Sequence, residues 1–406
     1  MTPPPPAEHR GPVVHDWALA PLPDTVFDPL PHRLLREEPV ARVRLRHGEG
    51  DAWLVTRYED VKQIASDPRL SRALTVGRPV TSMTPHTLAP AGGVGRADPP
   101  DHTRLRKLIA PTFGRRRMTA LREHTRRTAD ALALRMAGAG PPADLAEHFV
   151  GPLAATVIAE LLGVPTADLD LVERWRAGVL STDTTEAEGE SVKKEIAGYF
   201  ADLARHRTEH PGDDLVSELA AARAAGGIST PELVSMAVML TLNGLDAVRN
   251  IVATMVYVLL VHPEQTAKIR AEPDRLPGAV DELLRYIPQR NGVGMPRIAT
   301  ADIEVGGVTV REGEAVYVFY PAANRDPSVY TEPDRLDLAR NEAPHLAFGH
   351  GAHYCAGAQL ARMEAEVMLS TLLTRFPGLA TAVEPERIAW RRGTVNRGPV
   401  TLPVTW

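Results

Sequence analysis

The single cysteine of the chain, Cys355, lies in a glycine-rich segment, F-G-H-G-A-H-Y-C-A-G, that spans residues 348–357. Glycine adopts backbone angles that other residues avoid and lets the backbone approach a bulky group closely. Residues 356–373 follow with apolar side chains at helical spacing, so we expect Cys355 at a helix N-terminus. The helix dipole stabilises a thiolate there, which predicts a lowered thiol pKa.

Three kinds of chemistry remain open for such a thiolate. A single free cysteine is most often a buried structural side chain. A nucleophile would need a histidine base, but His350 and His353 share the same tight loop, whereas catalytic histidines usually come from elsewhere in the sequence. A zinc site needs about four protein ligands, whereas heme iron needs one protein ligand on its proximal side. The residues alone therefore leave a cysteine hydrolase, a heme protein and a helical protein without catalysis as alternatives.

A second candidate group is Asp246, which interrupts a long apolar run in the segment N-G-L-D-A-V, residues 243–248. The run begins after Ser229 with a hydroxyl cap, a proline and a glutamate, and it ends before Pro263. We expect one long buried helix across the domain. A buried carboxylate is costly unless it has a partner or a task, so Asp246 either pairs with a neighbour such as Arg249 or moves protons.

The elements that must position these groups are mainly helical. Residues 101–290 show helical spacing almost throughout, whereas the segments 43–45, 52–56, 298–310 and 315–319 have strand character. Residues 401–405 are expected to form an edge strand because Pro403 cannot donate to a ladder. Residues 74–98 form a long loop that is expected to close over a ligand. We expect residues 1–13 to be disordered and residues 14–406 to form one domain.

Composition excludes several classes of protein. The chain has 406 residues with 46 Lys+Arg and 51 Asp+Glu, a net charge of −5, which argues against a nucleic-acid binder. One cysteine rules out an intrachain disulfide scaffold. We find no uninterrupted apolar run of the ~18 residues that span a bilayer, and no signal peptide. These features predict a soluble, cytoplasmic protein without a membrane anchor.

Residues 348–362, F-G-H-G-A-H-Y-C-A-G-A-Q-L-A-R, resemble the heme-binding signature of the cytochrome P-450 family. Glu282-Leu283-Leu284-Arg285 resembles the E-x-x-R motif of that family, and Arg335 lies in a segment that resembles the source of its second arginine. The resemblance extends from Trp17 to Trp406. It implies a single-domain cytochrome P-450 fold, mainly α with small β-sheets, in which Glu282, Arg285 and Arg335 have a structural role.

The resemblance also implies a heme b site. Cys355 would be the iron ligand, with Phe348 and Gly349 on the thiolate side of the heme. The propionates would bind four cationic side chains, which are His102, Arg106, Arg297 and His353. On the oxygen side, Gly244 would open a groove in the long helix and Asp246 would deliver protons. The substrate pocket would be lined by Leu240, Asn243, Asn291, Gly292, Val293 and Val395.

One position departs from the pattern of the family. Ala247 occupies the place of the usual threonine, and alanine cannot bind a water or the distal oxygen. In this respect the chain is similar to biflaviolin synthase-like enzymes, which couple aromatic molecules oxidatively. The resemblance implies an oxidoreductase of secondary metabolism that joins phenolic or tryptophan-derived diketopiperazine substrates, with room for two copies. The alternative is a monooxygenase that hydroxylates a polyketide or peptide.

The same resemblance implies that electrons come from a ferredoxin and its reductase. No segment of the chain resembles a flavin or iron–sulfur domain, and one cysteine cannot hold a cluster that needs about four. An acidic partner would bind basic side chains on the proximal face. The candidates are Arg104, Lys107, Arg115, Arg116, Arg117 and Arg362.

Overall fold

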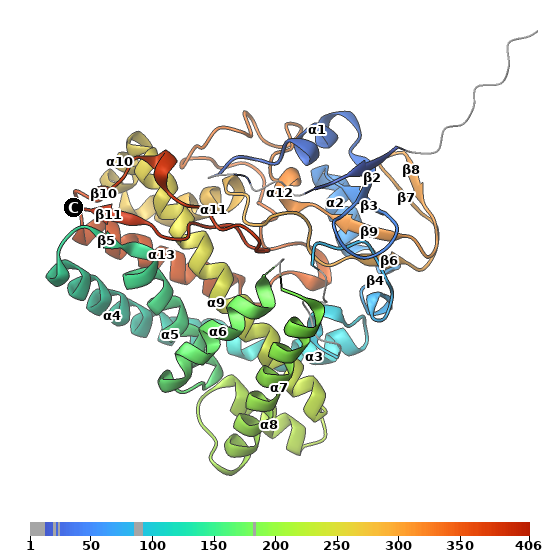
Figure 1. The fold of residues 1–406 in the computed structure, drawn as a ribbon, viewed down its shortest axis with the longest axis horizontal. Helices are drawn as coiled ribbons and strands as arrows, with labels where there is room; N and C mark the ends of the chain where they lie inside the picture. Colours follow the sequence, from blue (N-terminus) through green and yellow to red (C-terminus); the bar gives the residue numbers. More distant parts are fainter. Residues whose placement is uncertain (1–12, 19–21, 23–24, 85–91, 182–183) are drawn as a thin grey trace, which may run out of the picture.

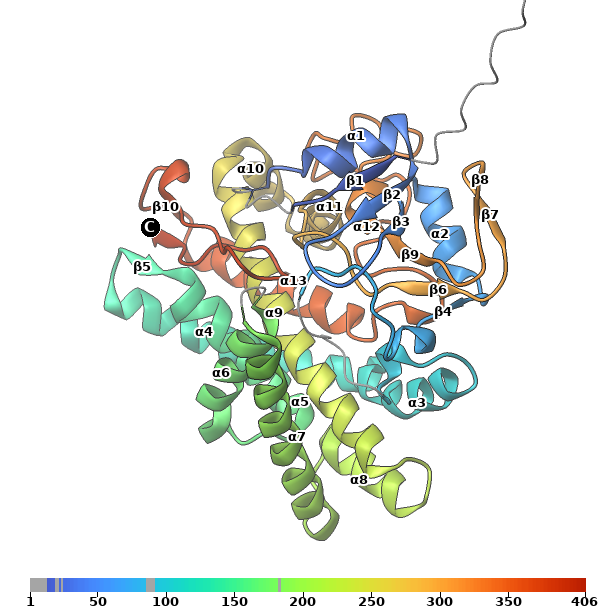
Figure 2. The ribbon, with the colours of Figure 1, turned by 45° about the vertical axis from the view of Figure 1, so that its right-hand side comes forward.

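The computed structural model describes residues 13–18, 22, 25–84, 92–181 and 184–406. A helical body and a smaller sheet region pack side by side, with the sheet region on the right in both orientations (Figures 1 and 2). The expected mainly α fold with small sheets is confirmed. The predicted disorder of residues 1–13 lies outside the described residues except for Val13, and β1 begins at Val14.

The helices follow the breaks that the sequence predicts. They are α1 Pro29–Glu37, α2 Tyr58–Ser66, α3 Asp101–Ile109, α4 Arg115–Ala139, α5 Gly151–Leu162, α6 Leu169–Leu180, α7 Glu186–Glu209, α8 Leu215–Ala224, α9 Thr230–Val261, α10 Pro263–Ala271, α11 Leu276–Tyr286, α12 Tyr320–Ala323 and α13 Ala358–Arg375.

Helix α9 crosses the whole helical body (Figures 1 and 2). It has 32 residues, and its start is fixed by a capping box in which the Ser229 side chain accepts from the Glu232 N–H while the Glu232 side chain accepts from the Ser229 N–H. The helix is long and apolar enough to cross a membrane by length and composition alone, although Asp246 and Arg249 interrupt its apolar run. However, 72% of its most apolar window is buried inside the protein, as in a core helix.

The larger sheet joins distant parts of the chain. Its strand order is β1-β2-β3-β9-β6-β4, and β3 Ala52–Val55 pairs in parallel with β9 Ala315–Val318. The other strands of this sheet are β1 Val14–Asp16, β2 Val40–Arg44, β4 Leu70–Ser71 and β6 Arg297–Ala299. The expected hairpin forms between β7 Ile303–Val305 and β8 Val308–Val310, with positive φ at Gly306 and Gly307.

The C-terminal strand corrects one prediction. β11 Pro403–Thr405 is the central strand of a three-stranded sheet, between β10 Ala380–Thr381 and β5 Ala143–Asp144. Pro403 is tolerated because it is the first residue of the strand and because its carbonyl oxygen accepts from the Ala382 N–H.

A buried ion pair ties α11 to the segment that follows α12. Arg285 Nε donates to Glu282 Oε2 over 2.6 Å, and both side chains are only 2% exposed. The prediction that the Arg335 side chain is the third member of this buried network is wrong. The side chain is 63% exposed and pairs with Glu332. Arg340 takes that place: it is 7% exposed, and its Nε lies 3.2 Å from Glu282 Oε1. The Arg335 segment instead offers its backbone carbonyl oxygen to Arg285.

Candidate heme and oxygen site

The loop before α13 places Cys355. Its backbone N–H donates to the Phe348 carbonyl oxygen over 2.9 Å, which closes the loop around a short 3-10 turn, Gly351–His353. Gly351 has φ +72°, and a Cβ there would lie 2.5 Å from the carbonyl oxygen of Ala65 at the end of α2. The glycines of this loop therefore allow it to lie directly against α2.

The environment of the Cys355 thiol corrects the expectation of a lowered pKa. Burial raises the pKa of Cys355, although an N–H of Gly357 and the charges of Arg106 and Arg362 act in the opposite direction. Yet the side chain is exposed. A side chain that is reached by solvent and is still enclosed by protein must line an internal recess.

Four predicted cationic side chains gather beside this recess from three parts of the chain. His102 and Arg106 lie one turn apart on α3, and the rings of His102 and His353 have centroids 4.3 Å apart. Arg297, at the start of β6, is close enough to lower the pKa of His353 by its charge. Arg106 is fixed by donating to the carbonyl oxygen of Tyr354 over 2.8 Å.

Sequence analysis missed a fifth cation, Arg72. Burial lowers its pKa to about 9, and its charge lowers the pKa of both His102 and His353. Arg72 follows β4, which pairs with the strand that carries Arg297. This sheet contact joins segments more than 220 residues apart, so no local motif indicates it.

The donors of this cluster fit the propionates of a heme. Nη1 and Nη2 of Arg297 and Nε of Arg72 are buried and have no hydrogen-bond partner among the described residues. Burial and the charges of Arg72, His102 and Arg297 lower the pKa of His353 to about 2. Buried cationic donors without hydrogen-bond partners, beside an accessible cysteine, are typical of a site for an anionic group that accepts several hydrogen bonds. Two carboxylates on a planar macrocycle meet that need.

The oxygen-side residues lie on α9. Asn243 and Ala247 are exposed one turn apart, whereas Asp246 is 2% exposed. A Cβ at Gly244 would lie 2.5 Å from Ile158 Cδ1, so this glycine lets α5 pack closely on α9. The proposed groove at Gly244 stays a prediction.

Asp246 does not pair with Arg249. Arg249 Nη1 binds Glu173 Oε2 on α6 over 3.2 Å. Asp246 Oδ2 instead accepts from Asn396 Nδ2 over 2.6 Å. Asn396 lies 150 residues further along the chain, so the predicted pairing of Asp246 with its i,i+3 neighbour Arg249 was wrong.

The predicted substrate-pocket residues divide into two groups. Leu240 and Asn243 share a face of α9, and the Asn243 side chain donates to the carbonyl oxygen of Met239. Val293 and Val395 are almost fully buried, at 4% and 1% exposed. Asn291 donates through its backbone to Val395 and through its side chain to Thr394.

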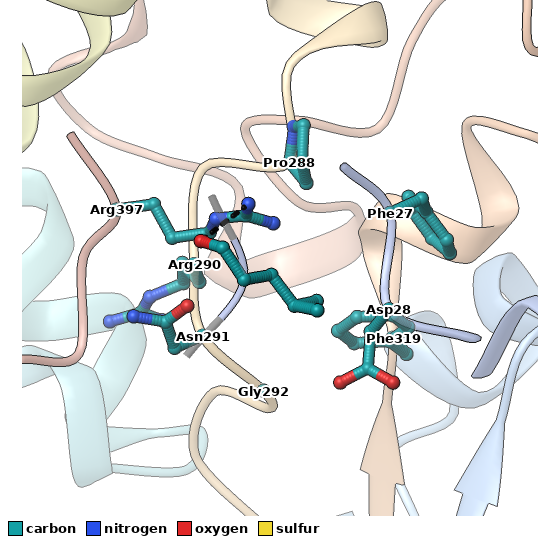
Figure 3. Close-up of a pocket in the computed structure, with 9 residues that line it drawn as sticks. Phe27, Asp28, Pro288, Arg290, Asn291, Gly292, Phe319 and Arg397 are labelled. Carbon is teal, nitrogen blue, oxygen red and sulfur yellow. Dashed lines mark hydrogen bonds between the residues drawn. The ribbon is translucent and has the colours of Figure 1, made fainter. Parts of the chain in front are cut away.

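Asn291 and Gly292 also line a small cavity of about 10 Å³ (Figure 3). Arg290, Asn291 and Arg397 lie on one side of it, and Phe27 and Phe319 lie on the other. A volume of this size holds about one water molecule and no substrate. This cavity is therefore not the predicted aromatic pocket.

Arg290 is a second residue that sequence analysis did not assign. Burial lowers its pKa, the charge of Asp246 raises it, and its side chain has no hydrogen bond or ion pair with a described residue. Its Nη1 would lie 3.4 Å from a Cβ at Gly294, so the guanidinium faces the segment after α11. A guanidinium that lies near Asp246 and has unused donors is suited to bind an anion or a phenolic oxygen.

Most of the predicted basic surface is already paired. Arg104 binds Glu232 and Asp101, Arg117 binds Asp213, and Arg362 binds Asp281. The Arg115 side chain lies outside the described part of the structure. Lys107 and Arg116 are exposed and make no ion pair with described residues, so they are the free charges of this set.

Comparison with known proteins agrees with this geometry. The cytochrome P450 family model matches residues 182–389. The chain is 44% identical over 395 residues to a biflaviolin synthase from Streptomyces coelicolor, with 97% of each chain covered. It is 48% identical over 374 residues to nocardicin C N-oxygenase from Nocardia uniformis subsp. tsuyamanensis, covering 92% of this chain and 94% of that relative.

A crystal structure of cytochrome P450mel 107F1, described as having biaryl coupling reactivity, superposes with a TM-score of 0.94. It is 42% identical, and the match covers 97% of this chain and 100% of that chain. Relatives that span almost the full length therefore share both the sequence and the fold. The chain belongs to the cytochrome P450 family, whose members are oxidoreductases that bind heme through a cysteine thiolate.

Proposed function

We propose that this P450 joins two aromatic natural-product molecules by oxidative C–C coupling. Cys355 would hold the iron, because it is the one cysteine in the chain. Arg297, His102, Arg106 and His353 would bind the propionates, and the orphaned nitrogens of Arg297 support this assignment. Bound heme supplies activation of O2, which thiolate donation favours.

The overall reaction balances without oxygen in the product. Two aromatic molecules, O2, two protons and two electrons give one coupled product and two water molecules. The two hydrogens lost from the rings and the two added protons end in water. This balance requires two protons to reach the oxygen side of the site, and Asp246 is the buried acid of α9 in that region.

The observation that carries the proposal is Ala247. This residue is exposed on the same face of α9 as Asn243, yet it offers no hydroxyl to orient oxygen or water. The neighbouring Thr241 and Thr254 hydroxyls donate to carbonyl oxygens within the helix. Coupling tolerates the missing hydroxyl because no oxygen atom needs to be delivered to a carbon.

Arg290 supports a phenolic substrate over a neutral diketopiperazine. Burial already destabilises its guanidinium, so a phenolate oxygen that accepts from it would be favoured. The relatives include a biflaviolin synthase and a P450 with biaryl coupling reactivity, and this kinship supports the same reaction class.

Oxygen labelling tests the proposal. The holoenzyme is supplied with a ferredoxin, its reductase and 18O2, first with 2-naphthol and then with a tryptophan-derived diketopiperazine. We expect an unlabelled dimer of the phenol by mass spectrometry, with O2 consumed. A monomeric product that carries 18O as the main product would overturn the coupling assignment.

The second candidate function is oxygen insertion into a polyketide or peptide, as the similarity to nocardicin C N-oxygenase supports. In that case a hydroxyl or water carried by the substrate would replace the missing side chain at position 247. Both candidates use a ferredoxin and its reductase, and both place the enzyme in the cytoplasm.

A further inference from the structure

A short C-terminal segment, residues 394–398, lies across the middle of α9 and is called here the C-terminal strap. One side of the strap pairs with the segment after α11. The Asn291 N–H donates to the Val395 carbonyl oxygen over 2.9 Å, and the Arg397 N–H donates to the Gln289 carbonyl oxygen over 3.0 Å. The strap therefore contains one predicted substrate-pocket residue, Val395, and is hydrogen-bonded to a second, Asn291.

The other side of the strap contacts α9 at two successive turns. Asn396 Nδ2 donates to Asp246 Oδ2 over 2.6 Å. A Cβ at Gly398 would lie 2.5 Å from Asn250 Oδ1, so the strap backbone touches Asn250 directly. Asn250 in turn donates to the carbonyl oxygen of Asp246 over 2.9 Å. The carboxylate is thus held toward the strap and away from the exposed face of Ala247.

The strap also reaches two elements at the rim of the site. Thr394 forms an isolated bridge with Ser181 at the end of α6. Arg397 Nη1 donates to the carbonyl oxygen of Val26 over 2.8 Å, and its Nη2 lies 3.4 Å from that of Leu22. A ligand that displaces α6 or the N-terminal segment therefore acts on the strap.

We propose that Asn396 is a positioning residue for Asp246 and that it couples proton delivery to the substrate-side segment. While Asn396 donates to Oδ2, that oxygen is occupied and the carboxylate stays in its buried position. When the strap shifts, Oδ2 loses this donor and the carboxylate can turn toward the face of Ala247. This inference rests on the proposed role of Asp246, and it deepens the proposed function by adding control from the substrate side.

The test compares five holoenzymes: the natural protein, Asn396→Leu, Thr394→Val, Asp246→Asn, and the double variant that carries Asn396→Leu and Asp246→Asn. Leucine keeps the size of asparagine but removes the donor. Thr394→Val is the matched control, because the Thr394 hydroxyl donates within the strap to the Asn396 carbonyl oxygen and does not touch Asp246. Each is supplied with ferredoxin and reductase, with and without 2-naphthol, and the rate of O2 consumption and its ratio in H2O and D2O are measured.

For Asn396→Leu we expect the carboxylate to be released from the strap, so O2 consumption without 2-naphthol should rise about tenfold, the scale of one hydrogen bond to a charged group. The solvent isotope effect should fall, because proton delivery no longer waits for the strap to shift, whereas Thr394→Val should leave the isotope effect unchanged. In the Asp246→Asn background, Asn396→Leu should add nothing, since the two residues then act as one unit. A crystal structure of Asn396→Leu should show the Asp246 carboxylate turned away from the strap.

Two results would overturn the inference: effects of Asn396→Leu and Asp246→Asn that multiply independently, or an isotope effect that Asn396→Leu leaves unchanged. A retained carbonyl spectrum shows that each variant holds heme, and Asn396→Ala, which also lacks the donor, replaces the leucine variant if that one fails to fold. These readouts do not depend on which product forms. Labelled oxygen in the product would therefore overturn coupling and leave this inference standing.

Discussion

Arg340 Nε lies 3.2 Å from Glu282 Oε1, which makes Arg340 the second guanidinium on a carboxylate that Arg285 already binds through two nitrogens. One buried negative charge thus holds two arginines from segments more than 50 residues apart. The remaining donors of Arg285 bind the carbonyl oxygens of Asn324 and Pro333. This network fixes the segment after α12 against α11, and through it the loop that carries Cys355.

We expect Arg340→Ala to lower the free energy of unfolding by about 2 kcal/mol, because the Glu282 carboxylate and the Thr331 carbonyl oxygen both lose a buried charged donor, while Arg285 still balances the charge of Glu282. The matched control, Arg335→Ala, should change it by less than about 0.5 kcal/mol, since that side chain is 63% exposed. Urea unfolding monitored by circular dichroism measures both. Equal losses in the two variants would show that Arg340 is not the structural partner.

Glu364 on α13 predicts an unusual pH dependence. Its Oε2 is buried and has no hydrogen-bond partner among the described residues, and burial raises its pKa well above the usual range. The folded protein therefore holds a proton that the unfolded chain releases above about pH 4.3. Stability from this group is complete below that pH and is lost as pH rises toward the folded pKa.

Glu364→Gln keeps the shape and removes the titration. We expect the variant to gain stability over the natural protein at pH 8 by about 1–3 kcal/mol, and to gain less at pH 5. Glu366→Gln, two residues further along the helix at a partly exposed position, is the control and should show no such trend. Unfolding midpoints at the two pH values measure this difference. A gain of the same size at both pH values would contradict the assignment.

The free charges Lys107 and Arg116 predict a salt-dependent encounter with an acidic ferredoxin. Charge reversal to Lys107→Glu and Arg116→Glu should slow reduction of the heme several-fold at low salt, and added salt should shrink the difference. The control is Lys194→Glu on α7, which reverses an exposed charge elsewhere. Stopped-flow reduction at several salt concentrations provides the rates. If reduction is independent of salt and of these substitutions, the partner binds another face.

Local signals predicted the elements that local residues determine. The bounds of α2 and α9 follow from apolar spacing and, for α9, from the cap at Ser229, because the hydrogen bonds that start a helix lie within one turn. The hairpin at Gly306 and Gly307 is likewise encoded at its own turn.

Features that depend on contacts between distant segments were missed or misassigned. The roles inferred for Arg72, Arg340 and Asn396 each depend on a partner in another element. The residues next to them in the sequence give no sign of these contacts. The edge position expected for β11 failed for the same reason, since β5, which pairs with it, lies in the first half of the chain. The heme residues His102 and Arg297 came from resemblance. The structure places both of them beside His353, and their roles at a heme stay predictions.

The most direct test of the account is the carbonyl spectrum of Cys355→Ser. Serine is not ionised at neutral pH, so this variant has no thiolate to offer the iron. After reduction under carbon monoxide, the natural protein should show the Soret band shifted far to the red. The variant should lose that band even where heme remains bound through other contacts. A variant that keeps the red-shifted band would contradict the assignment of Cys355 as the iron ligand, on which the proposed chemistry depends.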